Sequence, residues 1–429
     1  MEEQLIYSMD IKNIQDKIKE YLPVRQYEKN KYGEVFTPMK LIEEMMDKLP
    51  KSVWKNPNLK WLDPANGIGN FPMVIFIRLN DGLKDIDGYK DENIRKRHII
   101  KNMLYMIELN EKNVDISREI FGSDANIYCG SFLEDGWKSA FKIDKFDVIV
   151  GNPPFQKERS GETAQGGRDI YPKFFIKSFE LLNEDCYLSF INPAKWRTPD
   201  KKGDLKQMWD IFVNNNPIFL KIYGFVETKK IFRGGAVTRI DYYVLQKNTR
   251  EYNNTIIIDE ENKEYKINLR DWNFLPNYDI DNIKRVLTDQ DNGIKIIYSR
   301  GNYGNDKPHI SKEKNGTFIY PVKHTHTIKD GDIYFWSNTN KNGHFGEKKV
   351  ILGKGLYPYP YNDYNGDYGM SNYSFGIPIS SKKEGDDIVN AINSKGFERL
   401  ISATKWNSGF TDHNMFKYFK PDFYKHFLI

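Results

Sequence analysis

Short continuous runs of apolar residues alternate with amphipathic stretches from about residue 57 onward. Strands buried on both faces have this continuous apolar character, whereas half-exposed strands alternate apolar and polar positions. The pattern therefore predicts an α/β domain built on a parallel sheet with helices on both faces. The first four runs are NLKWLDPA at 58–65, MLYMIELN at 103–110, ANIYC at 125–129 and FDVIVGN at 146–152.

Two later apolar runs, CYLSFINP at 186–193 and RIDYYVLQK at 239–247, predict further strands of the same sheet. The chain is longer than a single hydrophobic core usually supports, so two domains are expected. We place the first at 1–250 and the second at 251–429.

Helices are expected ahead of the first strand, over Ile11–Leu22 and after Pro38, where proline suits the first turn. Beyond residue 250 the predicted strands become shorter. A stretch rich in Tyr, Asn and Gly follows at 355–376. Between Asp81 and Arg97 the chain is highly charged and predicts a solvated helix or a lid.

The net charge of +5 permits binding to a polyanion but does not demonstrate it. Two cysteines, Cys129 and Cys186, can form neither a disulfide framework nor a CxxC-type zinc site. No segment has the length and apolarity of a membrane-spanning helix or the form of a signal peptide. These features predict a soluble cytoplasmic protein without structural metal.

A glycine-containing turn, DPANGIGNF, directly follows the first predicted strand. In doubly wound sheets such a turn lets the backbone approach a cofactor at the carboxyl end of the strand. The candidate cofactor residues are Asp63, Gly67, Gly69, Asn70 and Phe71. An ordinary glycine-rich turn would have the same GxG spacing.

The second predicted strand ends in Glu108. An acidic residue at this position can accept hydrogen bonds from both ribose hydroxyls of a nucleoside cofactor. The same residue could instead cap the following helix, and this residue alone does not distinguish the two roles.

The fourth predicted strand runs into Asn152, Pro153, Pro154 and Phe155. Neither proline can donate to a strand ladder, and each restricts the residue before it, so the strand ends in a stiff turn. The Asn152 side-chain oxygen and the Pro153 carbonyl could then converge on a primary amine, and Phe155 could stack on the ring that carries it. Directed acceptors of this kind would orient a poorly nucleophilic aromatic amine toward a methyl donor.

In this order the motifs resemble those of the γ group of adenine-N6 DNA methyltransferases. The resemblance covers residues 30–250 and rests on EVFTP at 34–38, DPANGIGNF, Glu108, GSFL at 130–133 and NPPF. It implies a class I S-adenosylmethionine-dependent methyltransferase fold, Rossmann-like with a mainly parallel seven-stranded sheet. A C-terminal α+β target-recognition domain would follow, and residues 387–395 resemble a recurrent helix of that domain.

The resemblance also implies individual roles. Phe36 and Thr37 would contact the methionine part of the cofactor, and Phe132 would pack against its adenine. Ser131 stands where the family usually has an aspartate, so the hydrogen bond to the cofactor amine would come from Ser131 or shift to Glu134 or Asp135. Phe232 would clamp the target base from its second face, although ordinary hydrophobic packing would also explain it.

The implied reaction transfers a methyl group from S-adenosyl-L-methionine to N6 of a flipped-out adenine in double-stranded DNA. A separate cognate restriction endonuclease would then be a possible partner, and no metal is needed. Two alternatives remain at this stage: a methyltransferase acting on RNA guanine or protein glutamine, and a non-catalytic DNA-specificity subunit. A nuclease motif formed by Asp332 with Glu347, Lys348 and Lys349 is a weaker possibility.

Overall fold

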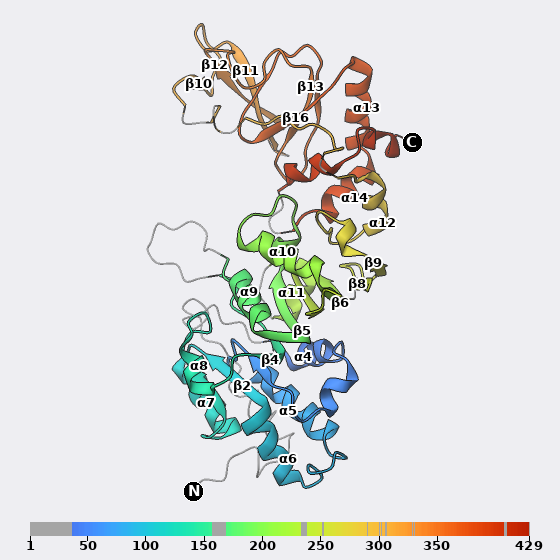
Figure 1. The fold of residues 1–429 in the computed structure, drawn as a ribbon. Helices are drawn as coiled ribbons and strands as arrows, with labels where there is room; N and C mark the ends of the chain where they lie inside the picture. The colour runs from blue at the N-terminus through green and yellow to red at the C-terminus, as the bar shows by residue number, and fades with distance from the viewer. Residues whose placement is uncertain are drawn as a thin grey trace. The chain divides into compact units, whose positions relative to one another are not determined.

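The computed structural model describes residues 37–156, 169–232, 238–250, 253–289, 291–299, 301, 303–304, 307–327, 329, 331–406 and 410–428 (Figure 1). The expected helix Ile11–Leu22 and the candidate Phe36 lie outside these residues. The chain forms two compact units: Met1–Trp196 with Lys202–Asp271, and Arg197–Lys201 with Trp272–Ile429.

The first unit is built on a nine-stranded sheet with the order β3-β2-β1-β4-β5-β7-β6-β8-β9. Neighbouring strands among the first five are parallel, and β7 is antiparallel to both β5 and β6. The strands are β1 (Trp61–Asp63), β2 (Leu104–Glu108), β3 (Asn126–Cys129), β4 (Phe146–Gly151), β5 (Leu182–Pro193), β6 (Asn216–Tyr223), β7 (Ile240–Gln246), β8 (Thr255–Ile258) and β9 (Glu264–Ile267).

The first seven strands form the mainly parallel sheet that the sequence predicts. The hairpin of β8 and β9 extends it, because β8 pairs in parallel with β6. The first unit therefore continues to Asp271, whereas the sequence analysis placed the domain boundary near residue 250.

Helices cover both faces of this sheet, as two adjacent tyrosines of β7 show. Tyr242 donates a 2.8 Å hydrogen bond to Glu44 on one face. Tyr243, which points the opposite way in the strand, packs against Phe175 and Phe212. The helices are α4 (Met39–Met46), α5 (Asn70–Gly82), α6 (Glu92–His98), α7 (Glu111–Phe121), α8 (Gly136–Phe141), α9 (Tyr171–Leu181), α10 (Asp204–Asn214) and α11 (Phe225–Ile231).

Short helical segments complete this unit: η1 (Lys51–Lys55), η2 (Ile99–Met103), η3 (Ala194–Arg197, whose last residue belongs to the second unit) and η4 (Leu269–Asp271). Helix α4 begins directly after Pro38, as predicted. In the charged segment Asp81–Arg97, α6 is a short helix whose Arg95 and Lys96 are buried, so it is less solvated than expected.

The second unit is α+β, as expected, with two small sheets ordered β10-β12-β11-β15 and β14-β13-β16. Its strands are β10 (Ile310–Ser311), β11 (Tyr320–Thr327), β12 (Gly331–Ser337), β13 (Lys349–Gly353), β14 (Tyr361–Asp363), β15 (Gly369–Met370) and β16 (Ser374–Pro378). Its helices are α12 (Ile280–Val286), α13 (Lys382–Ile392), α14 (Lys395–Ala403), η5 (His413–Tyr418) and η6 (Phe423–His426).

The segment 387–395 is not one helix, contrary to the sequence expectation. Helix α13 ends at Ile392, and the Ser394 side chain accepts a hydrogen bond from the Phe397 backbone to cap α14. A serine whose hydroxyl binds a backbone N–H favours the start of a helix over its interior, which explains the break.

The nuclease motif considered from the sequence is not assembled. Asp332 accepts a 2.6 Å hydrogen bond from Lys323, Glu347 pairs with His344, and the Lys349 ammonium lies 2.7 Å from Asp363. Among the residues described, no group of three or more His, Cys, Asp or Glu side chains is placed to hold a metal ion.

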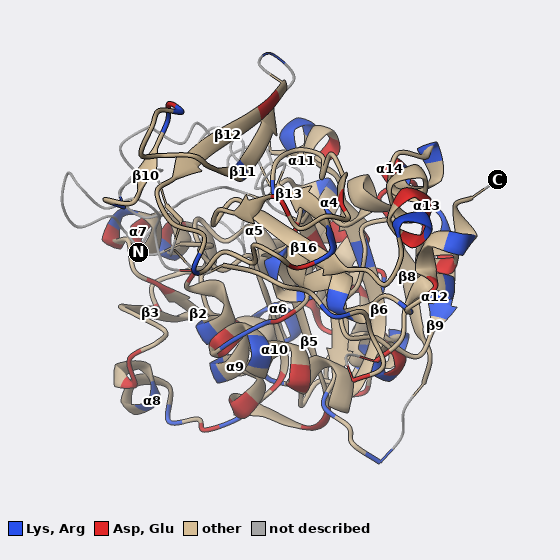
Figure 2. Ribbon diagram, turned by 90° about the horizontal axis from the view of Figure 1, so that it is seen from above, with Lys and Arg blue, Asp and Glu red and all other residues tan. Residues whose placement is uncertain are grey.

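Charged residues of both signs are interspersed over the helices of the protein, so the net charge does not by itself identify a nucleic-acid face (Figure 2). In the described part of the chain, no helix combines the length and apolarity needed to cross a bilayer.

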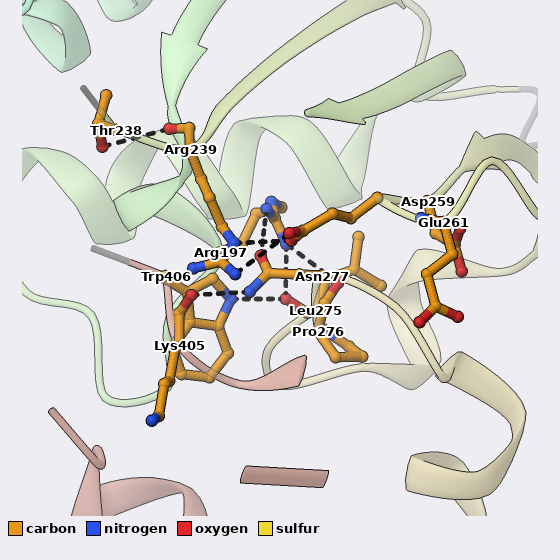
Figure 3. Close-up of polar contacts among 11 residues, drawn as sticks. Arg197, Thr238, Arg239, Asp259, Glu261, Leu275, Pro276, Asn277, Lys405 and Trp406 are labelled. Atoms are coloured by element: carbon orange, nitrogen blue, oxygen red, sulfur yellow. Dashed lines mark hydrogen bonds and ion pairs between the residues drawn. The ribbon is translucent and has the colours of Figure 1, made fainter. Parts of the chain in front are cut away.

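A fully buried arginine ties three segments of the second unit together (Figure 3). Arg197 donates to the carbonyl oxygens of Leu275 and Pro276 at 2.8 and 3.1 Å and to Asn277 Oδ1 at 2.9 Å. The Trp406 indole N–H donates to the same Leu275 carbonyl at 2.8 Å. The rigid guanidinium fork thus supplies the donors for the Pro276 carbonyl and Asn277 Oδ1 and shares the Leu275 carbonyl with Trp406.

Replacing Arg197 by Met should therefore lower the free energy of unfolding of the second unit by about 3 kcal/mol, because the Pro276 carbonyl and Asn277 Oδ1 lose their donor and the Leu275 carbonyl keeps only the Trp406 indole. Urea denaturation followed by fluorescence measures the change. Arg399, whose side chain is 45% exposed, provides a control, and Arg399→Met should cost less than about 1 kcal/mol. Equal effects of the two substitutions would contradict this role of Arg197.

Candidate active site

A cavity in the first unit lies at the carboxyl ends of β1, β2 and β4. Its empty space, open mouth included, is about 1060 Å³. Most of the candidate residues line it: Thr37, Gly67, Asn70, Phe71, Glu108, Ser131, Phe132, Asn152, Pro153, Pro154 and Phe155. The structure thus brings the separate sequence motifs together, while their individual roles stay predictions.

The turn after β1 leads into helix α5. Gly69 has φ = 95° and precedes the helix directly. A Cβ at this position would lie 2.7 Å from the Phe121 ring, so both the backbone conformation and the packing require glycine. Helix α5 spans 13 residues, and its N-terminal residues Asn70 and Phe71 line the cavity. The positive end of a helix dipole favours a negatively charged ligand group.

Asp63 does not line the cavity, although the sequence analysis groups it with the cofactor residues. Its side chain is 2% exposed, and Oδ1 accepts a 3.0 Å hydrogen bond from the Ala65 backbone that stabilises the turn. Oδ2 has no hydrogen-bond partner among the described residues. Burial away from water raises the pKa of Asp63 to about 8, and the nearby Glu108 charge adds to this effect.

Glu108 connects the turn after β1 with the start of helix α7. One carboxylate oxygen accepts from the Gly67 backbone at 2.7 Å, and the other accepts from the Asn110 backbone at 2.7 Å. Asn110 in turn caps helix α7. The two interpretations left open from the sequence are therefore compatible, since a carboxylate that supports a helix start retains lone pairs for further donors.

The segment after β3 supplies an aromatic wall. Phe132 is 2% exposed and packs against Trp137 and Phe174, with ring centroids 6.1 and 5.4 Å apart. Ser131 lines the cavity. Asp135 is engaged in ion pairs with Lys138 and Lys177.

Of the acceptors considered for the cofactor amine, Ser131 is the one whose position fits. Glu134 is exposed and, like Asp135, does not line the cavity.

The NPPF turn follows β4 and faces the same cavity. The Asn152 side-chain nitrogen donates to Thr37 Oγ1 at 3.1 Å. The Phe155 carbonyl accepts from the Ile170 backbone at 3.0 Å, which ties the turn to the segment ahead of α9. The stiff turn predicted from the two prolines is thus anchored on both sides.

Phe232 is not brought into the cavity. It ends α11, is 6% exposed, and belongs to the hydrophobic core of the first unit. Residues 233–237, which follow it, lie outside the described part of the chain. Its position favours ordinary packing, the alternative that the sequence left open, over a base clamp.

Several lining residues were not singled out from the sequence. Leu109, Ile170 and Phe174 provide apolar contacts, and Asn66 contributes a side chain whose amide donates to Ser117 Oγ at 2.8 Å. Leu109 is 59% exposed. Phe174 occupies an apolar position of an amphipathic helix, and such a position carries no sequence signal that separates a cavity wall from core packing.

Comparison with known proteins identifies the family of this domain. Residues 84–232 match the family described as Eco57I restriction-modification methylase. The matched range contains Glu108, the Ser131–Phe132 segment and the NPPF turn. This chain contains a restriction-modification methylase domain. The methylase domain is thus an enzyme domain, and the methyl donor of its family is S-adenosyl-L-methionine, both as the sequence resemblance implied.

Relatives of the methylase domain carry consistent names. A Mycoplasma pneumoniae protein named as an adenine-specific methylase is 27% identical over 50% of this chain and 67% of its own length. The type II methyltransferase M.VspI of a Vibrio species is 30% identical over 38% of this chain and 37% of its own length. The chain therefore spans about two thirds of the first relative and little more than a third of the second.

A solved structure shows the same fold. The type IIL restriction-modification enzyme MmeI, determined in complex with DNA, superimposes with a TM-score of 0.51 over 94% of this chain and 66% of its own, at 11% sequence identity. Together with the strand order, this confirms the class I methyltransferase fold expected from the sequence.

The cavity of the methylase domain fits S-adenosyl-L-methionine on its own chemistry. Asn66 and Asn70 line it, and each carries a buried side-chain oxygen without a hydrogen-bond partner among the described residues. Glu108 would accept from the ribose hydroxyls, Ser131 would bind the adenine amine, and Phe132 would pack on the adenine ring. The N-terminus of α5 would hold the carboxylate.

The buried Asp63 makes a prediction about stability and pH. Its folded-state pKa of about 8 lies above the unfolded value of about 3.9, so the folded protein retains a proton that the unfolded chain loses. Stability should therefore fall as the pH rises from about 4 through 8. Thermal denaturation of the ligand-free protein at several pH values should show a smaller fall for Asp63→Asn, which keeps the acceptor for Ala65. Parallel profiles for the two proteins would rule out this account.

Proposed function

We propose that this chain transfers a methyl group from S-adenosyl-L-methionine to the N6 amine of an adenine flipped out of double-stranded DNA. The observation that carries the proposal is the position of Asn152 and Pro153 in the cavity that also contains Glu108, Ser131 and Phe132. Amine acceptors and nucleoside-binding residues thus share one site. The name of the Mycoplasma relative supports adenine as the target, and the DNA complex of the structural neighbour supports DNA as the substrate.

The chemistry requires orientation more than a strong base. When bound, the cofactor would supply a methyl group carried on a sulfonium. The bond from the amine nitrogen to the methyl carbon would form as the carbon–sulfur bond breaks, and the sulfur would leave as a thioether. Asn152 Oδ1 and the Pro153 carbonyl would accept the two N6 hydrogens, which draws the nitrogen lone pair out of conjugation and toward the methyl group. The methylated amine then releases one proton to water. A cysteine nucleophile has no part in this reaction.

Asn152→Ala should reduce the rate of methyl transfer by about 100- to 1000-fold, because one of the two directed acceptors is lost. Transfer of a labelled methyl group to DNA measures the rate, and a DNA-binding assay serves as the control, since affinity should change little. Asn183→Ala removes a half-buried amide that donates to Asp147 at 2.7 Å, away from the cavity lining, and should leave the rate near wild type. Near-normal turnover of Asn152→Ala would show that the acceptor model is wrong.

Base extrusion offers a second test, because two aromatic residues were candidates for stacking on the base. Phe155 lines the cavity, whereas Phe232 is buried in the core. With 2-aminopurine at the target position, Phe155→Ala should weaken the fluorescence rise on binding by several-fold, because a stacking surface is lost. Phe232→Ala should mainly lower the melting temperature. The reverse result would restore Phe232 as the base clamp and remove Phe155 from that role.

The second unit is the candidate target-recognition domain, with its boundary at residues 271–272 and the short segment 197–201 included. A cognate restriction endonuclease acting separately would fit the family to which the methylase domain belongs. Sequencing that detects modified bases, applied to DNA from cells expressing the gene, would identify both the methylated base and its sequence context. RNA or protein methylation without DNA methylation would overturn the proposal.

A further inference from the structure

Thr37 connects two parts of the site, the NPPF turn and the start of helix α5. Its side chain is 4% exposed and lines the cavity. Its hydroxyl oxygen accepts from the Asn152 amide at 3.1 Å, and its carbonyl accepts from the Asn70 amide at 3.0 Å. Thr37, which lies two positions before the start of α4, therefore contacts both the NPPF turn and the first residue of α5.

The helix that follows Thr37 is itself held in place. Glu44 on α4 accepts hydrogen bonds from Tyr242 at 2.8 Å and from Tyr223 at 3.2 Å, on strands β7 and β6. Both tyrosine side chains are anchored in the sheet, and Leu41 and Met45 of α4 are buried against the core. The Thr37 hydroxyl is thus presented from a rigid support, as a residue that positions another must be.

The hydrogen-bonding capacity of Thr37 is only partly used. A hydroxyl offers one donor and two acceptor positions. Toward Asn152 it acts as an acceptor, and its own hydrogen has no acceptor among the described residues. Because Thr37 lines the cavity, that hydrogen is available to a bound ligand.

The Asn152 amide has two orientations that differ by a half turn. In one, the nitrogen faces Thr37 and the oxygen serves as an acceptor for an amine. In the other, the nitrogen would face the amine, and N–H groups would oppose N–H groups. A hydroxyl can support either orientation as long as its hydrogen is uncommitted, since it can accept from the nitrogen or donate to the oxygen.

We propose that Thr37 is a positioning residue that selects the amine-accepting orientation of Asn152 once the cofactor is bound. The inference rests on the proposed function. When the Thr37 hydroxyl donates to an acceptor of the bound cofactor, its hydrogen is no longer available to the Asn152 oxygen. The hydroxyl can then only accept, so the Asn152 nitrogen is held toward Thr37, the orientation that the structure shows, and its oxygen faces the target. Cofactor binding thereby completes the amine site.

A binding measurement tests this without turnover. The probes are two unmethylated duplexes that contain the recognition sequence. One has adenine at the target position, and the other has purine, which lacks the amine. With the unreactive cofactor analogue sinefungin at saturation, the wild-type protein should bind the adenine duplex about tenfold more tightly, because the purine leaves buried acceptors unsatisfied. Without the analogue this preference should be several-fold smaller.

Two substitutions separate orientation from packing. Thr37→Val replaces the hydroxyl by a methyl group of similar size and should reduce the adenine preference to less than about twofold even at saturating analogue. Thr37→Ser retains the hydroxyl and should keep the preference near the wild-type value. Circular dichroism and analogue affinity establish that each variant is folded and loaded.

A double substitution provides the sharpest control. In Asn152→Asp both side-chain atoms facing the amine and Thr37 are oxygens, so no orientation has to be selected. Adding Thr37→Val to this variant should change the adenine preference by less than about twofold. If Thr37→Val alone keeps the wild-type preference, Thr37 does not orient Asn152.

The failure of this inference is distinguishable from failure of the proposed function. If the wild-type protein methylates DNA but shows no adenine preference that depends on the analogue, the Thr37 mechanism is wrong and the enzyme activity stands. If wild-type protein methylates no DNA, the proposed function itself fails, and the inference fails with it.

Discussion

The site depends on one constraint of parallel sheets: strands that run side by side in the same direction end at the same edge. Strand β1 lies between β2 and β4 and pairs in parallel with both. The turn after β1, Glu108 at the end of β2 and Asn152 after β4 are therefore neighbours, although 41 residues separate Gly67 from Glu108. Ligands of open α/β sheets bind at this edge, where the strand order changes direction.

This constraint explains why the sequence was informative about the cavity. Glycine at 69, glutamate at 108 and the diproline turn each lie at the end of an apolar run that predicts a strand or in the turn that follows it. Once three such strands are expected to be parallel, their ends must meet. The contact of Thr37 with Asn152 was not predictable in the same way, because a hydrogen bond between residues 115 positions apart leaves no local pattern.

The features that the sequence did not predict also have physical causes. Strand β6 was not among the apolar runs predicted as strands. It follows Asn214 and Asn215 and begins with Asn216 and Pro217, residues more typical of a turn. Strands β8 and β9 have four residues each and were assigned to the second domain because the long apolar runs end before them. Phe232 matched the position of a family motif, and its role as a base clamp stays a prediction, because the motif does not encode the tertiary packing that buries this side chain. The break at Ser394 lies within an otherwise helical pattern and depends on a single capping hydroxyl.

The charge of the cavity lining distinguishes between nucleoside ligands that the fold alone would permit. Doubly wound sheets with a glycine-containing first turn also bind dinucleotides, whose phosphates are anionic. Here the described residues that line the cavity include the carboxylate of Glu108 but no lysine or arginine side chain. Among the described lining residues a pyrophosphate would find only the N-terminus of α5, whereas a ligand that carries a sulfonium and an ammonium group gains from the carboxylate of Glu108. Electrostatics and the acceptor geometry of the NPPF turn therefore favour the same ligand, a cationic methyl donor beside a neutral amine.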